Sequence, residues 1–428
     1  MSFYTSGVKS TILEPTFDIT NNRTEWRLPA DGVYLSNMRI CNLALTGSET
    51  AYNRLVGAYG VIKSISLLDG NEMLDQLLIA NMWMGFKLFN KSNNSSLNVE
   101  RRLALNAVGY MFDNGSISDQ IIEPSVTADN SKETAKSYLS LKDVFSFFRN
   151  VDYVSTIYFR SLRIVIEYET NKVNLVTDTS HTDLKTFEDP LLIMDEVVND
   201  AVRKANASFK GVAFLSIESD TAYIPLPTTL PASTAPVVQT ENILLKGFDN
   251  KYVSRMLICF TPRTEKVLVG KANEVLANGY IGSYASINSK LQLRINGMNK
   301  LAGEGITRPN QRLAMLNDTF GNCNAVPGGN DIGMFATTDY FIYGGDDEET
   351  RTALQLQYTG TADYHGILVA DRIQDLQVAF TRTLQYDEVG SADSGTTQFN
   401  DALRMTVFAE VQKAIVPRKG GGFDIRYT

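Results

Sequence analysis

Histidine, the side chain most often used for acid–base catalysis and metal binding near neutral pH, is rare in this chain. Its 428 residues contain two histidines, His181 and His365, and neither has a second histidine at the spacing of a metal site. His181 lies in Ser180-His181-Thr182-Asp183, which contains the residue types of a hydrolytic triad. The groups of a triad converge from separate elements, however, and neighbours in one polar loop cannot stack in sequence. We therefore interpret His181 as a solvated loop residue and expect no catalytic role for His365.

Two segments have the composition of ligand sites without their spacing. Asp346-Asp347-Glu348-Glu349 offers the oxygen ligands that calcium prefers, but it lacks the alternating positions of a calcium-binding loop, so we interpret it as a solvated acidic loop. Gly420-Gly421-Gly422 follows Arg418-Lys419, whereas a phosphate-binding loop has its lysine after the glycines and a helix behind it. We interpret this glycine run as a flexible hinge before a short tail.

The aromatic group Phe145, Phe147 and Phe148 is more typical of a β-sandwich core than of a ligand site, because aromatic side chains bury large areas. With this group assigned to the core, the sequence predicts no catalytic residue, no cofactor-binding residue and no metal site. We expect that the protein is not an enzyme and needs no cofactor.

Composition and charge narrow the function classes further. A formal net charge of −8 disfavours direct wrapping of nucleic acid, because phosphate binding needs clustered lysine and arginine. No apolar run reaches the roughly 18 residues of a membrane span, and the start of the chain lacks the layout of a signal peptide. Three cysteines, Cys41, Cys259 and Cys323, are odd in number and far apart. These features predict a soluble protein made inside a cell, with buried thiols.

Strand patterns dominate the first half of the chain. From Gly32, apolar residues occur on both parities, which is typical of a strand buried on both faces. Residues 61–68 form a second predicted strand that ends at Asp69-Gly70, and behind this turn Asn71 can cap a helix with apolar residues at 73, 74, 77, 78 and 84. The alternation at 162–168 predicts another strand, and Asp195–Asn206 has the apolar spacing of an amphipathic helix.

Proline separates these elements from those that follow. Pro225, Pro227, Pro231 and Pro236 exclude a helix or a central strand, so this stretch predicts a loop or crossover near the midpoint. The elements predicted beyond it are strands at 243–245, 252–260, 291–295, 373–380 and 405–416, with a short helix at 311–316.

The two halves of the chain contain the same order of elements. VIKSISLLDG from Val61 matches KLQLRINGMN from Lys290, since both are a strand and an Asx-Gly turn with a predicted helix behind. FRSLRIVIEYE from Phe159 corresponds to RIQDLQVAFTRT from Arg372. The offsets are about 227 and about 214 residues, which agree to within ordinary loop variation. The sequence therefore predicts two copies of one all-β sandwich with long loops.

Some of these segments carry a family resemblance. The strand ending in LLDG, the segment LSLKDVFSFFRN leading into LRIVIEYE, and the closing RMTVFAEVQKAIVP resemble the double jelly-roll major capsid proteins of double-stranded DNA viruses. In length and layout the chain is most similar to the polinton-like virus, adintovirus and virophage branch. The resemblance implies two tandem jelly rolls with a few short helices. Its domains would be an N-terminal arm at 1–20, jelly rolls at 21–207 and 208–422, and a C-terminal tail at 423–428.

The resemblance also implies a function in assembly. Members of the family form trimers whose six jelly rolls stand upright in an icosahedral shell, so the expected partners are further copies of the chain, penton and minor or cement capsid proteins, and an internal membrane. No sequence-specific binding of nucleic acid is expected. The candidate assembly contacts lie in the arm and the tail: Phe3, Tyr4, Lys9, Phe423 and Tyr427.

Two alternative functions stay open. A minor capsid protein, either a penton or a receptor-binding protein, would share the fold but occur in few copies per particle. A carbohydrate-binding protein or enzyme on a β-sandwich would need clustered tryptophan or tyrosine beside paired carboxylates. Because the chain has only two tryptophans, Trp26 and Trp83, this aromatic platform would rest on tyrosine.

Overall fold

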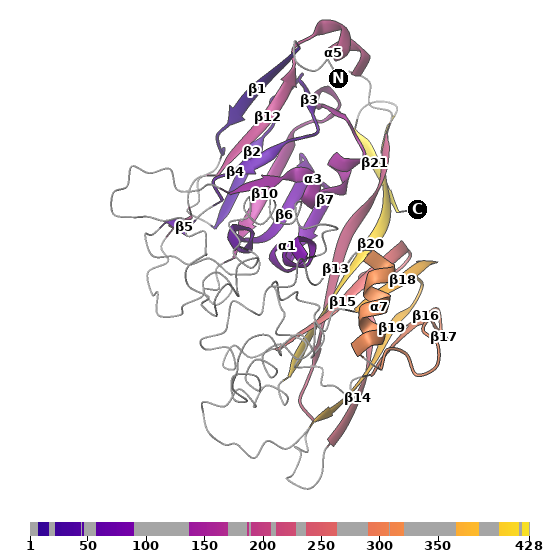
Figure 1. Ribbon diagram of the computed structural model, residues 1–428. Coiled ribbons are helices and arrows are strands. Elements are labelled where there is room, and N and C mark those ends of the chain that lie inside the picture. The colour runs from indigo at the N-terminus through magenta and orange to yellow at the C-terminus, as the bar shows by residue number, and fades with distance from the viewer. Residues whose placement is uncertain are drawn as a thin grey trace.

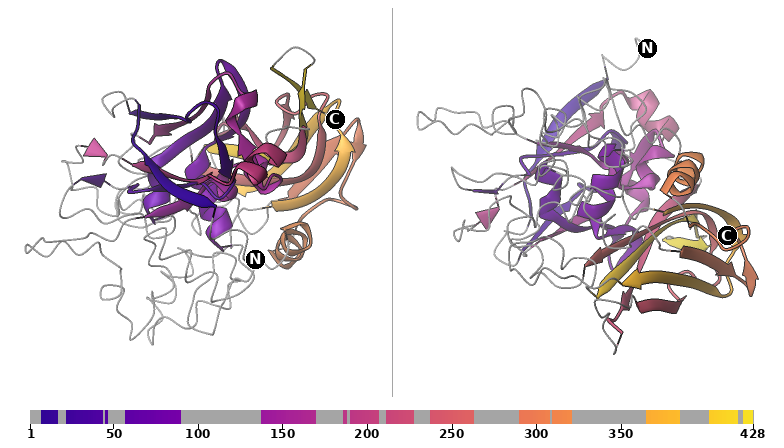
Figure 2. Two further views of the ribbon diagram at one scale, coloured as in Figure 1. Left: turned by 90° about the horizontal axis from the view of Figure 1, so that it is seen from above. Right: turned by 60° about the horizontal axis from the view of Figure 1, so that its bottom comes forward.

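The protein consists of two β-sandwiches joined along one side (Figure 1). The structure is a computed structural model, and it describes residues 7–16, 22–43, 45–46, 57–89, 137–169, 186–187, 190–206, 211–227, 237–262, 290–307, 309–320, 365–384, 402–418 and 422–427. In Figure 2 the first sandwich, in indigo to magenta, lies beside the second, in rose to yellow, in both views.

The first sandwich contains two antiparallel sheets. One sheet is formed by β1 (Val8–Leu13), β3 (Val33–Leu35), β4 (Arg39–Cys41), β8 (Tyr138–Ser140), β9 (Tyr153–Ser155) and β12 (Leu191–Val197). The facing sheet is formed by β2 (Arg23–Arg27), β6 (Ile62–Asp69), β7 (Glu72–Leu78) and β10 (Leu162–Tyr168). A short separate pair joins β5 (Leu45–Thr46) to β11 (Thr186–Phe187). The helical elements are η2 (Gly57–Val61), α1 (Ala80–Phe89), α3 (Leu141–Val144), α4 (Ser146–Arg149), η5 (Thr156–Tyr158) and α5 (Asp200–Asn206).

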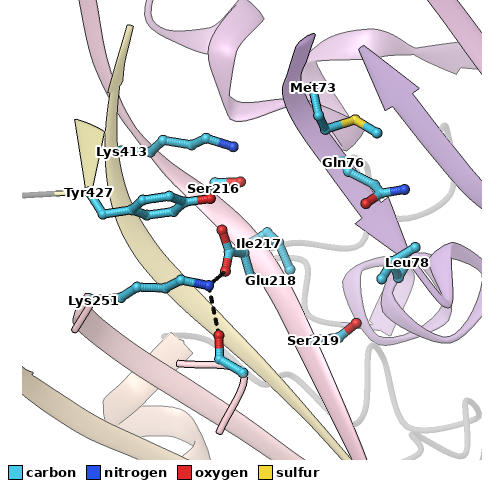
Figure 3. Close-up of a pocket in the computed structure, with 11 residues that line it drawn as sticks. Met73, Gln76, Leu78, Ser216, Ile217, Glu218, Ser219, Lys251, Lys413 and Tyr427 are labelled. Carbon is cyan, nitrogen blue, oxygen red and sulfur yellow. Dashed lines mark hydrogen bonds and ion pairs between the residues drawn. The ribbon is translucent and has the colours of Figure 1, made fainter. Parts of the chain in front are cut away.

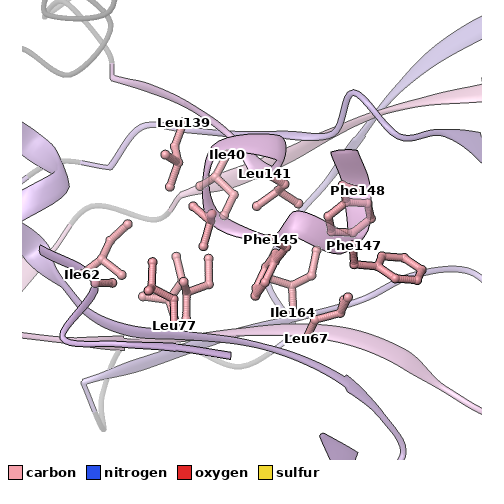
Figure 4. Packing of buried hydrophobic residues seen from close by; sticks show 14 of the residues in the cluster. Ile40, Ile62, Leu67, Leu77, Leu139, Leu141, Phe145, Phe147, Phe148 and Ile164 are labelled. Atoms are coloured by element: carbon pink, nitrogen blue, oxygen red, sulfur yellow. The ribbon is translucent and has the colours of Figure 1, made fainter. Parts of the chain in front are cut away.

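Side-chain alternation explains how the first sandwich closes on its core. Ile164 of β10 and Leu67 of β6 are paired across the strands, and both point inward, as the period of two in a strand requires. Ile40 of β4 faces them from the opposite sheet (Figure 4). Phe145 and Phe148 close the space between the layers, which confirms the core position that the sequence predicts for this aromatic group.

The second sandwich is built in the same way from longer strands. One sheet is formed by β13 (Val212–Ile224), β15 (Tyr252–Pro262), β18 (His365–Arg372), β20 (Leu403–Pro417) and β21 (Phe423–Tyr427). The other is formed by β14 (Val237–Leu245), β16 (Lys290–Ile295), β17 (Met298–Asn299) and β19 (Leu376–Leu384). The helix α7 (Pro309–Phe320) follows β17 and packs on β18.

Strand order shows that both sandwiches are jelly rolls. In the first roll, β3 and β4 together form the third strand, and β8 and β9 together form the sixth. The strand order of one sheet is then β1, β12, β3/β4 and β8/β9, and that of the other is β2, β10, β6 and β7. The second repeats this order with β13, β20, β15 and β18 in one sheet, and β14, β19, β16 and β17 in the other. In both, the first strand pairs with the eighth and the second with the seventh, which is the double Greek key of a jelly roll. The predicted fold class of two tandem jelly rolls with short helices is confirmed.

The predicted repeat coincides with this duplication. Both Asx-Gly turns connect the fourth and fifth strands of a roll: Asp69-Gly70 joins β6 to β7, and Asn296-Gly297 joins β16 to β17. Gly70 and Gly297 have positive φ angles of 59° and 80°, which a tight hairpin needs and glycine adopts without strain. The second sequence pair also matches, since β10 and β19 are the seventh strands of their rolls.

Two predicted helices are partly wrong, and for the same reason. Residues 73–78 form the strand β7, and the helix α1 begins only at Ala80. Residues 195–197 belong to strand β12, and the helix α5 begins at Asp200. In each case an apolar spacing near four residues comes from a strand that runs into a helix. Pairing with a neighbouring strand, β6 for residues 73–78 and β1 for residues 195–197, outweighs the helical pattern.

Three segments differ from the predicted layout. Within the arm predicted for 1–20, residues 8–13 form β1, which pairs with β12 as an edge strand of the first sheet. Pro225 and Pro227 lie inside the second roll, between β13 and β14, so the proline-rich stretch does not divide the copies. The change from one roll to the other falls between α5 and β13, and the predicted tail forms β21, which pairs with β20.

Candidate functional site

The two jelly rolls meet along one buried interface, which we call the seam. It is formed by β7, α1 and α4 of the first roll and by β13, β20, β21 and α7 of the second. The core of the first roll continues across the seam, because one cluster of buried apolar side chains also contains Phe214, Leu257 and Phe408 of the second roll. β20 is therefore buried on both faces: Val407 faces the core of its own roll, and Phe408 faces the first roll.

One end of the seam is a cluster of four aromatic rings. Trp83 and Phe86 of α1 have ring centroids 5.5 Å apart, and Trp83 lies 5.4 Å from Phe408 of β20. Phe320, the last residue of α7, meets Phe86 edge to face at 5.1 Å. Tilted and edge-to-face rings add about 0.5–1.5 kcal/mol per pair beyond the area that they bury. This aromatic end joins α1 and α7, the helices that follow the fifth strand of each roll, mainly through ring packing.

An ion pair holds α7 against the second roll beside the aromatic end. Arg255 of β15 donates two hydrogen bonds to Glu410 of β20, from Nε to Oε2 at 2.6 Å and from Nη2 to Oε1 at 2.8 Å. Its Nη1 donates to the carbonyl of Thr319 at 2.8 Å. The planar guanidinium suits this two-point contact with a carboxylate, and the third bond satisfies a carbonyl in the last turn of α7.

The other end of the seam is polar and encloses a pocket of about 260 Å³ (Figure 3). β7 contributes one wall of this pocket, and the second roll contributes the rest. Its lining residues are Met73, Gln76, Leu78, Ser216, Ile217, Glu218, Ser219, Gly247, Lys251, Lys413 and Tyr427. Side chains of β7, β13, β20 and β21 meet there with Lys251, which directly precedes β15, so ionisable groups from both rolls lie close together at this polar end.

Asp75 lies beside this pocket on β7, in contact with the second roll. Its partner across the strands is Leu67, so its side chain lies on the core-facing side of the edge strand, where only 2% of it is exposed. Ser216 of β13 donates a hydrogen bond to Asp75 Oδ1 at 2.6 Å. Burial raises the pKa of Asp75 to about 6, while this hydrogen bond and the positive charge of Lys413 oppose the rise.

Lys413, Glu218 and Lys251 supply the facing charges. Lys413 of β20 is 4% exposed, and Figure 3 shows its ammonium group pointing across the seam toward β7. Burial lowers the pKa of Lys413, and the charges of Asp75 and Glu218 raise it. Lys251 donates hydrogen bonds to Glu218 Oε2 at 2.6 Å and to the carbonyl of Gly247 at 2.7 Å (Figure 3).

Tyr427 of β21 completes the polar end. Its ring lies 5.0 Å from Lys251 Nζ and 5.5 Å from Lys413 Nζ, within the range of cation–π attraction. Although 41% of the residue is exposed, burial of the hydroxyl side, together with the charge of Glu218 and a hydrogen bond to it, raises the pKa of Tyr427 to about 12. The phenol therefore stays protonated at physiological pH.

The predicted assembly residues lie in different environments. Lys9 is exposed on β1. Phe423 is 1% exposed and stacks on Phe159 of the first roll with ring centroids 4.7 Å apart, so its side chain is occupied within its own chain. Tyr427 borders the pocket and keeps an exposed side, while Phe3 and Tyr4 lie outside the described residues.

The other predicted features are only partly described. Cys41 and Cys259 are buried thiols, as expected, and Cys323 lies outside the described residues. His181 and the acidic run 346–349 are also outside them, and His365 is the first residue of β18. In the part of the chain that is described, no group of three or more metal-ligating side chains comes together. None of the described helices has the length and apolarity needed to cross a membrane.

Sequence reasoning did not single out Asp75 or Lys413, although each left a signal. Asp75 falls in the segment predicted as a helix, where a lone carboxylate is expected on the solvated face. Lys413 lies in the apolar run of β20, between Val411 and Ile415. A lysine that shares one face of a strand with buried apolar residues indicates a buried partner.

Comparison with known proteins gives matches by structure alone. No family model matches the sequence, and the comparison with curated proteins found no match. The mavirus major capsid protein aligns over 99% of this chain and 90% of its own, with 9% identity and a TM-score of 0.53. A chain of the Sputnik virophage structure aligns over 99% of this chain and 88% of its own, with 9% identity and a TM-score of 0.57. The Faustovirus major capsid protein covers 96% and 90%, with 7% identity and a TM-score of 0.51.

These similarities span both rolls and the seam between them. Alignment over almost the whole chain means that the match includes the tandem arrangement, since a single shared roll would cover about half of it. The chain therefore has the fold of the double jelly-roll major capsid proteins of double-stranded DNA viruses.

Proposed function

We propose that this protein is a major capsid protein that assembles as pseudo-hexagonal homotrimers into the icosahedral shell of a double-stranded DNA virus. The observation that carries the proposal is the repetition of one strand order in two rolls joined by a buried seam, together with the structural match to viral major capsid proteins over nearly the whole chain. The proposed role is structural, and no catalytic step is part of it.

The tandem fold suits this role geometrically. Two rolls with the same strand order present similar outlines, so three chains around a threefold axis would place six similar sandwiches in a ring. A near-hexagonal block can tile a closed shell with few kinds of contact. The buried seam matters here, because a block whose halves moved independently would not keep its hexagonal outline.

Exposed apolar side chains on the second roll are available for contacts between chains. Tyr223 at the end of β13 is 59% exposed, Val238 of β14 is 64% exposed and Leu368 of β18 is 62% exposed. Contacts within a trimer would bury such residues permanently, whereas contacts between trimers would be weaker and more polar, so that misplaced blocks can leave. Lys9 and Tyr427 are the proposed terminal contacts whose side chains retain exposed surface.

The proposed location is the virion, after assembly in the host cell. The proposed partners are neighbouring trimers, penton and minor or cement proteins, and an internal membrane. The net charge of −8 argues against direct packaging of DNA by this chain.

The native mass of the purified protein tests the proposal most directly. We expect light scattering to give three times the mass of the chain, and electron microscopy of the same sample to show particles with a six-lobed outline. A monomer in every buffer would contradict the trimer.

The abundance of the chain in purified virions separates a major from a minor capsid protein, because a shell protein dominates the particle by mass.

The N-terminal contacts need a narrower deletion than the predicted arm. Removing residues 1–6 leaves β1 intact, whereas a cut through residue 13 removes a strand of the first sheet. We expect the shorter deletion to leave trimers intact and to lower the yield of closed shells. Normal shells with normal stability would show that Phe3 and Tyr4 are not assembly contacts.

A further inference from the structure

The polar end of the seam links the two rolls through ionisable side chains. Asp75 belongs to β7 of the first roll, and the serine that donates to it, Ser216, belongs to β13 of the second. Lys413 faces both from β20. Any opening of the seam at this end would separate Asp75 from these two second-roll residues and admit water to its carboxylate.

We propose that the polar end of the seam is a proton-controlled latch, in which a proton on Asp75 holds the two jelly rolls of one chain closed and loss of that proton loosens them. The proposal does not depend on a role in capsids, because every group in the latch belongs to a single chain.

The direction follows from where Asp75 lies. In the closed seam the carboxylate is out of water, and its pKa is about 6 against an ordinary value of 3.8. When the seam opens, water restores the ordinary value. Between these two values the closed seam binds a proton that the open seam releases, so acid favours the closed state. Above about pH 6 both states are ionised, and the closed state carries the cost of a buried carboxylate.

The charged groups around Asp75 come from several strands, and the nearest is Lys413 of β20, whose pKa burial lowers while the charges of Asp75 and Glu218 raise it. Lys251 is paired with Glu218 at 2.6 Å, and this pair lies on the second roll alone. The phenol of Tyr427 on β21 has a pKa of about 12 and stays neutral. α4, which also packs against β13 at this end, contributes the ring of Phe147, 6.0 Å from Phe214. Asp75 is the carboxyl group at this end whose pKa burial raises to about 6.

The size of the effect has an upper limit. The difference between the closed and ordinary pKa values corresponds to a change of about 100-fold in the ratio of closed to open seam between pH 4 and pH 7. A latch of this size would let acid stiffen a protomer and neutral pH soften it, without breaking the aromatic end.

Hydrogen exchange of the purified full chain tests the latch. Amide protection in β7 and in residues 212–217 of β13, corrected for the intrinsic pH dependence of exchange, is measured between pH 4.5 and pH 7.5. We expect protection to fall by up to about 100-fold as the pH rises, with strands β16 and β19 of the second roll as an unchanged reference. Equal pH dependence in all four strands would overturn the proposal.

Two variants separate the latch from general effects of charge. Asp75→Asn removes the titrating group, so protection at the seam should become independent of pH. Ser216→Ala keeps the carboxylate but removes a hydrogen bond that favours its ionised form, so the midpoint of the pH change should move upward.

A carboxylate outside the seam provides the matched control. Asp195 of β12 accepts a hydrogen bond from Asn37 at 2.8 Å, and Asp195→Asn should leave the pH profile of the seam unchanged. A shift with Asp195→Asn, or no shift with Ser216→Ala, would assign the pH dependence to something other than Asp75.

Discussion

The two ends of the seam connect the same jelly rolls by different physical means. At the aromatic end, Trp83 and Phe86 pack on Phe320 and Phe408, and the contacts come from buried area and ring geometry. At the polar end, Asp75 and its neighbours pack around a pocket, and the contacts depend on charge. Apolar contacts carry no titratable group and are insensitive to pH, whereas a buried ionisable group responds to it. The comparison indicates that the aromatic end provides most of the stability of the contact between the rolls, and that the polar end makes this stability depend on pH.

The aromatic end should show the larger effect of substitution. Trp83 is 3% exposed and contacts three rings from both rolls, so Trp83→Ala should leave a large cavity. We expect a loss of about 3–5 kcal/mol in the free energy of unfolding, measured by denaturant titration of the full chain. The loss should be the same at pH 5 and pH 7.5. A pH-dependent loss would mean that the two ends are coupled. Trp83→Phe, which keeps a ring in place, should cost markedly less.

The pH dependence of stability is the next largest effect and belongs to the polar end. Because burial raises the pKa of Asp75 from 3.8 to about 6, the folded chain binds a proton more tightly than the unfolded chain. Stability should therefore fall as the pH rises from about 4 to about 6 and level off above that, by at most about 3 kcal/mol from this residue. Calorimetric or denaturant unfolding of the wild type and of Asp75→Asn measures this contribution as a difference. An identical slope in both proteins would refute the assignment.

The Arg255–Glu410 pair tests whether the aromatic end is purely apolar. Glu410→Gln keeps the shape but leaves the guanidinium without its carboxylate, and it weakens the attachment of α7 beside Phe320. We expect a loss of about 1–2 kcal/mol, smaller than that of Trp83→Ala, because Arg255 is 32% exposed and water can solvate it. A loss as large as that of Trp83→Ala would show that charge, and not ring packing, dominates this end as well.

The sequence predicted the architecture better than it predicted the seam. Strand alternation at 162–168 and the two Asx-Gly turns identify the duplication, because the period of two and the turn geometry are local properties. The spacing of Leu74 and Leu77 predicts a helix over 73–78, and only pairing with β6 makes this segment a strand. That error also hid Asp75. Its burial depends on β13, about 140 residues later, and no local pattern reports such a contact.

The smallest predicted effect concerns Tyr427 and separates two functions of β21. Tyr427→Phe removes the hydroxyl that bonds Glu218 but keeps the ring near Lys251 and Lys413, so the free energy of unfolding should fall by less than about 1 kcal/mol. Phe423→Ala, on the same strand, removes a buried ring that stacks on Phe159 and should cost about 3 kcal/mol. If Tyr427→Phe nevertheless reduces shell formation while the free energy of unfolding is unchanged, the exposed side of Tyr427 contacts a neighbouring chain. If both quantities stay unchanged, β21 acts through Phe423 alone, as an apolar strap between the rolls.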